Sequence, residues 1–298
     1  MEHLTASHPP RSDLQGQSST ESSPTHELPR VVIDGSSNWA RWWSDIVAYR
    51  GALYSLALRN IRSRYKQAVL GIAWAVLQPL LQVAVFTVVF SRIAGADPGG
   101  IPYPVFALAG LIPWNVLSKI ITDGSTSLAV NQHIITKLFF PRIYLVISAG
   151  TSALVDAIVG VVLLGGLMAL YGIAPAKTVL LALPALGAVM LLGFGLSALL
   201  AAVNARWRDV QHTIPFLLQI GLLATPIVYP PAVVSGRWQW LLALNPVTAI
   251  VAAFRSAVLG LPLPPEKMMV SSLAVSLGAV IVGLWYFTRA ERTIVDVV

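Results

Sequence analysis

The chain has 298 residues, of which 56% are hydrophobic and 11% are charged, and it contains no cysteine. A soluble fold could not bury that much apolar surface, so lipid must cover most of it, which excludes the soluble globular class. The lack of cysteine excludes disulfides and thiolate chemistry, and the net charge of +7 does not indicate a nucleic-acid partner, because the basic residues gather at the ends of apolar segments.

The N-terminal part of the sequence divides in two. Residues 1–30 are rich in Ser, Thr, Pro and His with few apolar residues, so we expect a disordered tail, and no signal peptide is visible. In residues 31–66, apolar side chains recur at spacings of three and four with arginines between them. This pattern predicts an amphipathic helix in the membrane interface, and it also suits a helix packed on the cytoplasmic ends of its own bundle.

A transmembrane domain is predicted for residues 67–292, followed by a short C-terminal tail at 293–298. Six apolar runs are expected to cross the membrane, since a spanning helix needs about 20 residues. They cover residues 69–90, 103–121, 143–171, 178–203, 210–229 and 268–287. Lys and Arg lie mainly on one side of these runs, which places both termini in the cytoplasm. The sequence therefore predicts an all-α integral membrane fold with six transmembrane helices.

Residues 238–261 are apolar but are not expected to cross the membrane. A further span would put Arg289 and Arg292 outside, and Asn245 with Pro246 divides the stretch into halves that are too short. We predict re-entrant gate helices at the extracytoplasmic mouth of a pathway, because backbone that is irregular at this depth needs protein or water around it. The candidate outer-gate residues are Trp240, Asn245, Pro246 and Arg255.

No catalytic or metal-binding constellation stands out. The five histidines lack metal-ligand spacing, and there is no G-x-x-x-x-G-K-[ST] loop to hold nucleotide phosphates. The chain is therefore expected to bind no cofactor and to be no enzyme, with ATP and Mg²⁺ used by a separate partner protein. Asp156 lies deep in a predicted span, where it suits either a packing residue or a proton relay.

Polar and aromatic side chains inside the predicted spans have two interpretations each. The amides of Gln78, Gln82, Asn115 and Gln219 could line a polar pathway or bond helices to one another. Aromatic rings can pack against the C–H faces of sugars, or they can serve as interface belts and helix packing. The candidates for a channel lining are Trp74, Phe86, Trp114 and Phe216.

The segment at 122–142 is placed in a cytoplasmic loop, yet it carries an apolar face. Water should not keep such a face exposed. A short amphipathic helix of this kind suits insertion into a groove on a partner, and folding back on the bundle is the alternative.

Five strings, in order, resemble the permease subunits of ABC-2-type transporters, and among them the polysaccharide and polyol phosphate exporters. They are RNIRSRYKQAVLGIAWAVLQP (59–79), LIPWNVL (111–117), N-x-x-I-I-x-K-x-F-F-P-R (ending at 142), N-x-R-W-R-D-V (204–210), and TPIVYP followed by LNPVTAIVAAFRSAVLG (244–260). The resemblance implies an ABC-2, type V exporter-like fold in the bacterial cytoplasmic (inner) membrane. It also implies a homodimer bound to two copies of a cytoplasmic ATPase, which moves a lipid-linked polysaccharide such as an O-antigen, a teichoic acid or a cell-wall galactan. Export of a small drug or lipid is the alternative function.

The resemblance also implies a role for the segment that ends at Arg142. It makes the segment at about 126–140 a coupling helix that contacts the ATPase, with Leu128, Asn131, Ile134, Ile135, Lys137, Phe140 and Arg142 as its contact residues. Val130 and His133 depart from the polar or acidic residues that relatives often carry there. Apart from the resemblance, we expect the cations before the first span to attract the substrate's diphosphate, since a lipid-linked anion needs cations near the headgroup plane; charge that only determines topology is the alternative. They are Arg59, Arg62, Arg64 and Lys66.

Overall fold

The computed structural model describes residues 47–66, 71–93, 98–135, 140–230, 242 and 244–297, and every regular element in these ranges is helical. Five helices in this part of the chain are long and apolar enough to cross a membrane. The predicted class, an all-α multi-pass membrane protein, is therefore confirmed. Two further apolar helices, Val210–Ala224 and Pro246–Leu259, are shorter, so the sixth crossing and the re-entrant form of residues 238–261 stay predictions.

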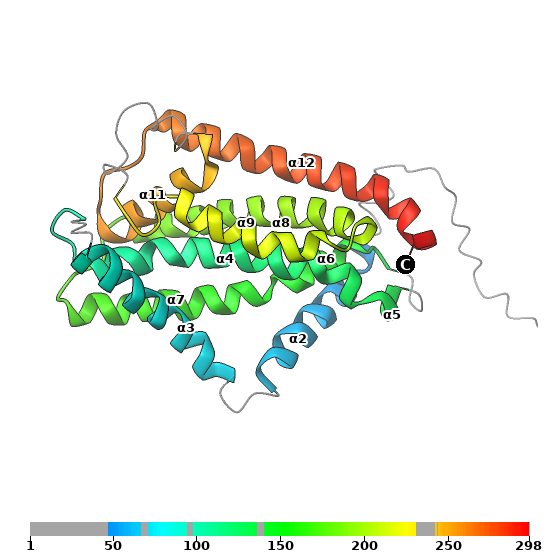
Figure 1. Cartoon of the computed structure of the whole chain (residues 1–298), viewed down its shortest axis with the longest axis horizontal. Helices are drawn as coiled ribbons and strands as arrows, with labels where there is room; N and C mark the ends of the chain where they lie inside the picture. Colours follow the sequence, from blue (N-terminus) through cyan, green and yellow to red (C-terminus); the bar gives the residue numbers. More distant parts are fainter. Residues whose placement is uncertain are drawn as a thin grey trace, which may run out of the picture. The chain divides into compact units, whose positions relative to one another are not determined.

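Helix α4 (Tyr103–Val130) lies at the centre of the bundle (Figure 1). Its apolar window is 78% buried, against packing partners α6 (Ile143–Gly150), α7 (Ser152–Leu170) and α8 (Ala182–Arg206). Pro104 lies in its first turn, where no intrahelical N–H is lost. The helix continues nine residues beyond the predicted end of the second span at 121, because one face of this extension stays packed in the core.

Helix α12 (Glu266–Val297) packs most extensively against α8. Two glycines allow this approach: a Cβ atom on Gly195 would lie 2.5 Å from the backbone of Ala279 and Val280, and a Cβ atom on Gly283 would meet the carbonyl oxygen of Gly195. Small residues are the usual means by which membrane helices bring their backbones together. The α8–α12 contact is thus fixed by backbone proximity rather than by large side chains.

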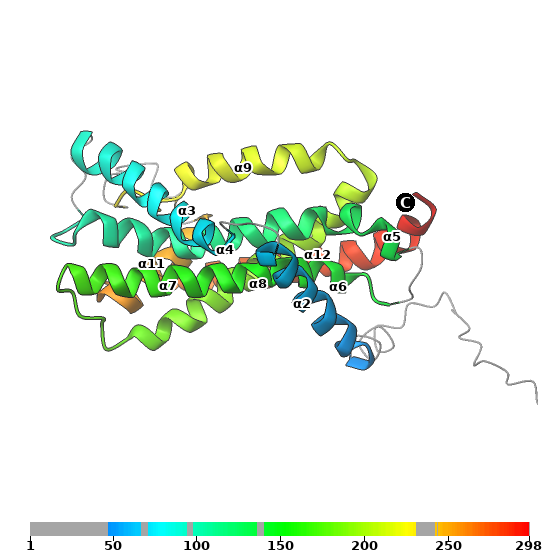
Figure 2. The same cartoon turned by 90° about the horizontal axis from the view of Figure 1, so that it is seen from below.

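Helices α2 (Arg50–Lys66) and α3 (Gly71–Phe86) are inclined to the long helices in both views (Figures 1 and 2). The π-helical segment η1 (Thr87–Ile93) continues α3, and the Thr87 hydroxyl donates to the carbonyl oxygen of Val83 at 2.6 Å. Only 6% of the apolar window formed by α3 and η1 is buried within the chain. This span therefore offers most of its surface to lipid or to a partner.

The short helices mark two ends of the bundle. Helix α11 (Pro246–Leu259) lies at one end, and α5 (Gln132–Ile135) and the end of α12 lie at the other in both views (Figures 1 and 2). Helix α9 (Val210–Ala224) runs beside α4, and the 3-10 turn η2 (Val179–Leu181) precedes α8. Following the predicted orientation, we call the α11 end the outer end and the α5 end the inner end.

Candidate transport pathway and its two ends

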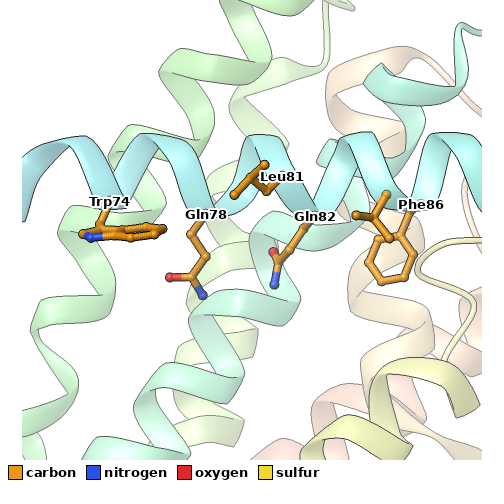
Figure 3. A pocket seen from close by; sticks show the side chains of 6 residues that line it. Trp74, Gln78, Leu81, Gln82 and Phe86 are labelled. Atoms are coloured by element: carbon orange, nitrogen blue, oxygen red, sulfur yellow. The ribbon is translucent and has the colours of Figure 1, made fainter. Parts of the chain in front are cut away.

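Four side chains recur every fourth residue along α3 and lie on one side of it: Trp74, Gln78, Gln82 and Phe86 (Figure 3). Residues four apart are neighbours on a helix surface, so the set forms a continuous stripe. With Leu81 and Val85 it lines a shallow groove. We call these four residues the α3 stripe. The structure thus brings together two predicted lining aromatics and two of the predicted pathway amides.

One of these amides also joins two helices. The Asn115 side-chain N–H on α4 donates to Gln82 Oε1 on α3 at 3.1 Å. For this pair, the interpretation as a helix-to-helix hydrogen bond therefore applies. Gln78 lies exposed one turn away. Asp156 is half-buried on α7 and has an interaction partner, as a packing residue would.

The other two predicted lining aromatics have opposite environments. Trp114 is only 7% exposed, and a Cβ atom on Gly221 of α9 would lie 2.8 Å from its indole ring. Its ring fills the space between α4 and α9 in this structure, and its role in lining a channel stays a prediction. Phe216 is 62% exposed on α9, on a face that it shares with the exposed Gln219 and Ile220.

At the outer end, Arg255 of α11 is buried at 3% exposure. Its guanidinium donates to the carbonyl oxygens of Phe106 at 3.3 Å and Pro226 at 2.9 Å, and also to that of Ile227. It lies 3.7 Å over the Phe106 ring, a cation–π arrangement. Gly110 makes room for it, since a Cβ atom there would overlap the guanidinium. Arg255, a predicted outer-gate residue, is thus a buried clamp between α11, α4 and the turn after α9, and its role in a gate stays a prediction.

Asn245 completes the outer contacts. Its Oδ1 accepts from the Val247 N–H at 3.0 Å and caps α11, while its Nδ2 donates to Thr225 Oγ1 at 2.8 Å. Pro246 follows as the first residue of α11, and its carbonyl oxygen accepts from the Ser272 hydroxyl of α12 at 2.7 Å. The two strings TPIVYP and LNPVTAIVAAFR therefore hold complementary halves of one hydrogen-bonded unit. Trp240 lies outside the described residues.

At the inner end, the predicted coupling segment is divided among separate elements. Leu128 belongs to the last turn of α4 and is 1% exposed, and its side chain packs in the bundle's own core. Ile135 and Phe140 are partly buried and pack against the same cluster. Ile134 is half-buried on α5, and Lys137 lies outside the described residues. For Leu128, Ile135 and Phe140 the structure favours the interpretation that the segment folds back on the bundle.

Two residues of this segment have exposed side chains. Val130 is 69% exposed and His133 is exposed, and they are the residues noted as departures from the family pattern. Asn131 ends α4, and its Oδ1 accepts from the Arg59 guanidinium of α2 at 2.8 Å. Arg142 is tied to the end of α12, since its guanidinium donates to the Glu291 carbonyl oxygen at 2.7 Å. The segment is thus connected to both α2 and α12.

Two of the four cations proposed for diphosphate entry, Arg59 and Arg62, have described side chains, and both lie exposed on α2. Arg59 has Asn131 as its partner, whereas Arg62 is exposed one turn further along α2. The side chains of Arg64 and Lys66 lie outside the described part. Arg62 is therefore the described member that is open to a ligand.

The sequence analysis missed two polar features in the inner half of the bundle, namely the bonds of Asn204 between elements and an ion pair within α4. Asn204, 1% exposed at the end of α8, donates to the Ser125 carbonyl oxygen at 3.2 Å and accepts from the Gln211 N–H at 3.1 Å. Lys119 of α4 forms an ion pair with Asp123 at 2.9 Å. The signal for the first was the string N-x-R-W-R-D-V, and for the second the polar residues between 115 and 126.

These features define a helical membrane protein with an open polar and aromatic face. Its sequence matches the family described as ABC-2 type transporter over residues 51–259, and the chain belongs to that family. It is 30% identical to the O-antigen export system permease protein RfbA of Myxococcus xanthus, over 81% of this chain and 91% of that protein. It is 26% identical to RfbA of Klebsiella pneumoniae over 66% of this chain and 76% of that protein. It is also 26% identical to the polysialic acid transport protein KpsM of Escherichia coli, over 69% and 80%.

Proposed function

We propose that this chain is the membrane-spanning permease subunit of an ABC transporter that exports a polysaccharide, with ATP hydrolysis in a separate subunit. The relatives named above are export and transport proteins for O-antigen and polysialic acid. The observation that carries the proposal in this chain is the α3 stripe, in which two aromatic rings flank two amides on an otherwise apolar span. Sugar rings offer C–H faces to aromatics and hydroxyls to amides, so the stripe suits a carbohydrate surface.

The exposure of α3 supports a homodimer. Gln78 is exposed on a span that is 6% buried, and an amide that faces lipid without a partner is costly. A second copy that turned its own α3 toward this one would enclose the stripe in a polar pathway. Phe216 of α9, which is also exposed, is the second candidate for its lining.

The inner end suits a cytoplasmic ATPase partner in two copies, which would bind ATP and Mg²⁺. The exposed Val130 and His133 are the residues of the coupling segment best placed to contact it. Closure of the two ATPase subunits would push this segment and change the access of the pathway as a rigid-body transition. The chain itself then has no enzymatic step.

The substrate we propose is a lipid-linked glycan in the cytoplasmic membrane of a bacterium, of the O-antigen, teichoic acid or cell-wall galactan type. A lipid diphosphate would approach at the headgroup level, where cations attract it. The proposed entry group consists of Arg62, Arg64 and Lys66. We assign Arg59 to coupling instead, because its guanidinium already donates a hydrogen bond to Asn131.

Depletion of the chain tests the function directly. Mass spectrometry of the glycolipids should show a lipid-linked polymer accumulating inside the cell, together with loss of surface glycan. Unchanged surface glycan combined with altered susceptibility to a drug would favour the small-molecule alternative.

Substitution of Trp74 tests the pathway. Trp74→Ala should reduce surface glycan, because it removes one ring of the α3 stripe. Trp285→Ala on α12 is the matched control, since both indoles are 52% exposed. Equal effects of the two substitutions would mean that Trp74 acts only as a lipid-facing residue.

A further inference from the structure

The inner half of α4 has one open face, and every residue on it is polar. In residues 111–128, six side chains are partly exposed, and all the others are buried. The six are Asn115, Ser118, Lys119, Thr122, Asp123 and Thr126. They recur at intervals of three and four, so they lie on a single side of the helix. We call them the α4 polar face.

Lipid does not account for this face. A helix side that met acyl chains would be apolar, and ionisable groups in a span are costly unless they face protein or water. A lysine near the end of a span can extend its ammonium toward the headgroups. Lys119 does not do so, since its Nζ lies 3.0 Å from one oxygen of Asp123 and 2.9 Å from the other. The pair therefore remains on the helix surface, 29% and 28% exposed.

Several groups beside this pair could bind a ligand. The Ser152 hydroxyl of α7 donates to Asp123 Oδ2 at 3.1 Å and orients the carboxylate. Ser118 Oγ is buried and has no hydrogen-bond partner in the described part of the chain. One turn toward the outer end, Asn115 bonds to Gln82, which belongs to the α3 stripe. The two polar surfaces are thus continuous.

From this arrangement we infer that the α4 polar face is a binding site for sugar hydroxyls in the inner half of the transport pathway. The inference rests on the proposed function and adds the site at which the inner part of the glycan is held. An ion pair with neighbouring hydroxyls presents donors and acceptors side by side, and a sugar hydroxyl can both donate and accept. A diphosphate is a poor ligand here, because Asp123 neutralises Lys119 and repels an anion.

The partial exposure of the pair also suits a site that must release its ligand. Conduction requires sites that bind well enough to admit the ligand and weakly enough to let it leave. Lys119 and Asp123 are partly exposed and form an ion pair with each other. Little free energy is lost when a sugar leaves them, because the ion pair forms again. A deep unpaired charge would not have this property.

The test uses the full transporter in its own cells, with surface glycan measured per amount of permease in the membrane. Lys119→Met combined with Asp123→Leu removes the hydroxyl-bonding groups but keeps their volume and neutrality, and Asp123→Asn removes the charge of the acceptor alone. The double variant should lower export by about fivefold, the effect of losing roughly one hydrogen bond per sugar, whereas Asp123→Asn should lower it less, because its amide oxygen still accepts. Lys177→Met in the exposed loop after α7 should leave export unchanged.

Two results would overturn the inference. Normal export by the apolar double variant would show that the pair only packs helices. Raised export by Asp123→Asn, with loss in Lys119→Met, would show an anion site instead. Failure of the proposed function itself is distinguishable, because surface glycan would then persist when the whole chain is depleted.

Discussion

The outer and inner ends of the bundle are held together in different ways. At the outer end, the clamp of Arg255 and the cap of Asn245 join α11, the start of α4 and the turn after α9 through buried and partly buried hydrogen bonds. At the inner end, α2 is attached through Arg59 to Asn131, an exposed bond, and the coupling segment through Arg142 to Glu291, a partly buried one. The clamp at the outer end thus consists of buried bonds, whereas the bond from Arg59 to Asn131 at the inner end is accessible to water.

This difference indicates which helices can change position. Buried polar networks are rigid, because opening one leaves several groups unsatisfied at once, whereas exposed bonds exchange with water at little cost. Elements that must respond to an ATPase therefore lie where their bonds are exchangeable. Helix α12 is bonded to both ends, through Ser272 to Pro246 and through Glu291 to Arg142.

The largest effect is expected from Arg255→Met. The substitution leaves the buried carbonyl groups of Pro226 and Ile227 without this donor and removes a second donor from the carbonyl of Phe106, so we expect the protein to lose about 3 kcal/mol or more of stability. Arg255→Lys should restore only part of it, since an ammonium cannot reproduce the planar fork of donors. Thermal unfolding of the purified protein, monitored by size-exclusion chromatography, measures the stability of both variants. A melting temperature unchanged by Arg255→Met would mean that the outer end is not held by this clamp.

A somewhat smaller effect is expected where α12 joins the two ends. Gly195→Ala forces apart the backbones of α8 and α12, because its Cβ atom would lie 2.5 Å from Ala279 and Val280 backbone atoms. We expect a loss of about 2 kcal/mol, typical of overpacking. Gly165→Ala is the matched control, because nothing lies within 4 Å of a Cβ atom there. We expect Gly195→Ala to lower the melting temperature and Gly165→Ala to leave it unchanged or raise it.

Asn245→Ala should cost about 1 kcal/mol, since it removes a helix cap together with one side-chain bond. Hydrogen exchange should become faster in the first turn of α11 and stay slow in α4. Thr225→Val separates the two contributions, because it removes the bond to Asn245 and retains the cap. Faster hydrogen exchange throughout the bundle would show that these two bonds stabilise the whole protein and not only the outer end.

The sequence predicted the fold class because run length and charge placement depend only on composition along the chain. It also found the α3 stripe residues, since Trp74, Gln78 and Phe86 stand out in an apolar run. It could not separate Trp74 from Trp114, because the burial of the second ring depends on Gly221 of α9, a contact distant in sequence. The burial of Arg255 could not be predicted either. Its partners are backbone carbonyl oxygens, which every residue has, so no side chain in the sequence indicates them.

The smallest effect on stability, and the one most informative about coupling, is expected at Arg59 and Asn131. Because their bond is exposed, Arg59→Gln should change the stability by less than about 1 kcal/mol. It should nevertheless lower export while the ATPase remains bound and active, since α2 would no longer follow the coupling segment. A double-mutant cycle with Asn131→Ala isolates this interaction, because two residues that act through one bond give a double variant no worse than the poorer single one. Arg62→Gln, one turn away and exposed, tests diphosphate entry instead and should add its full effect to either. If Arg59→Gln and Asn131→Ala were fully additive, Arg59 would act independently of the coupling segment, and its role would return to the cation cluster at the membrane surface.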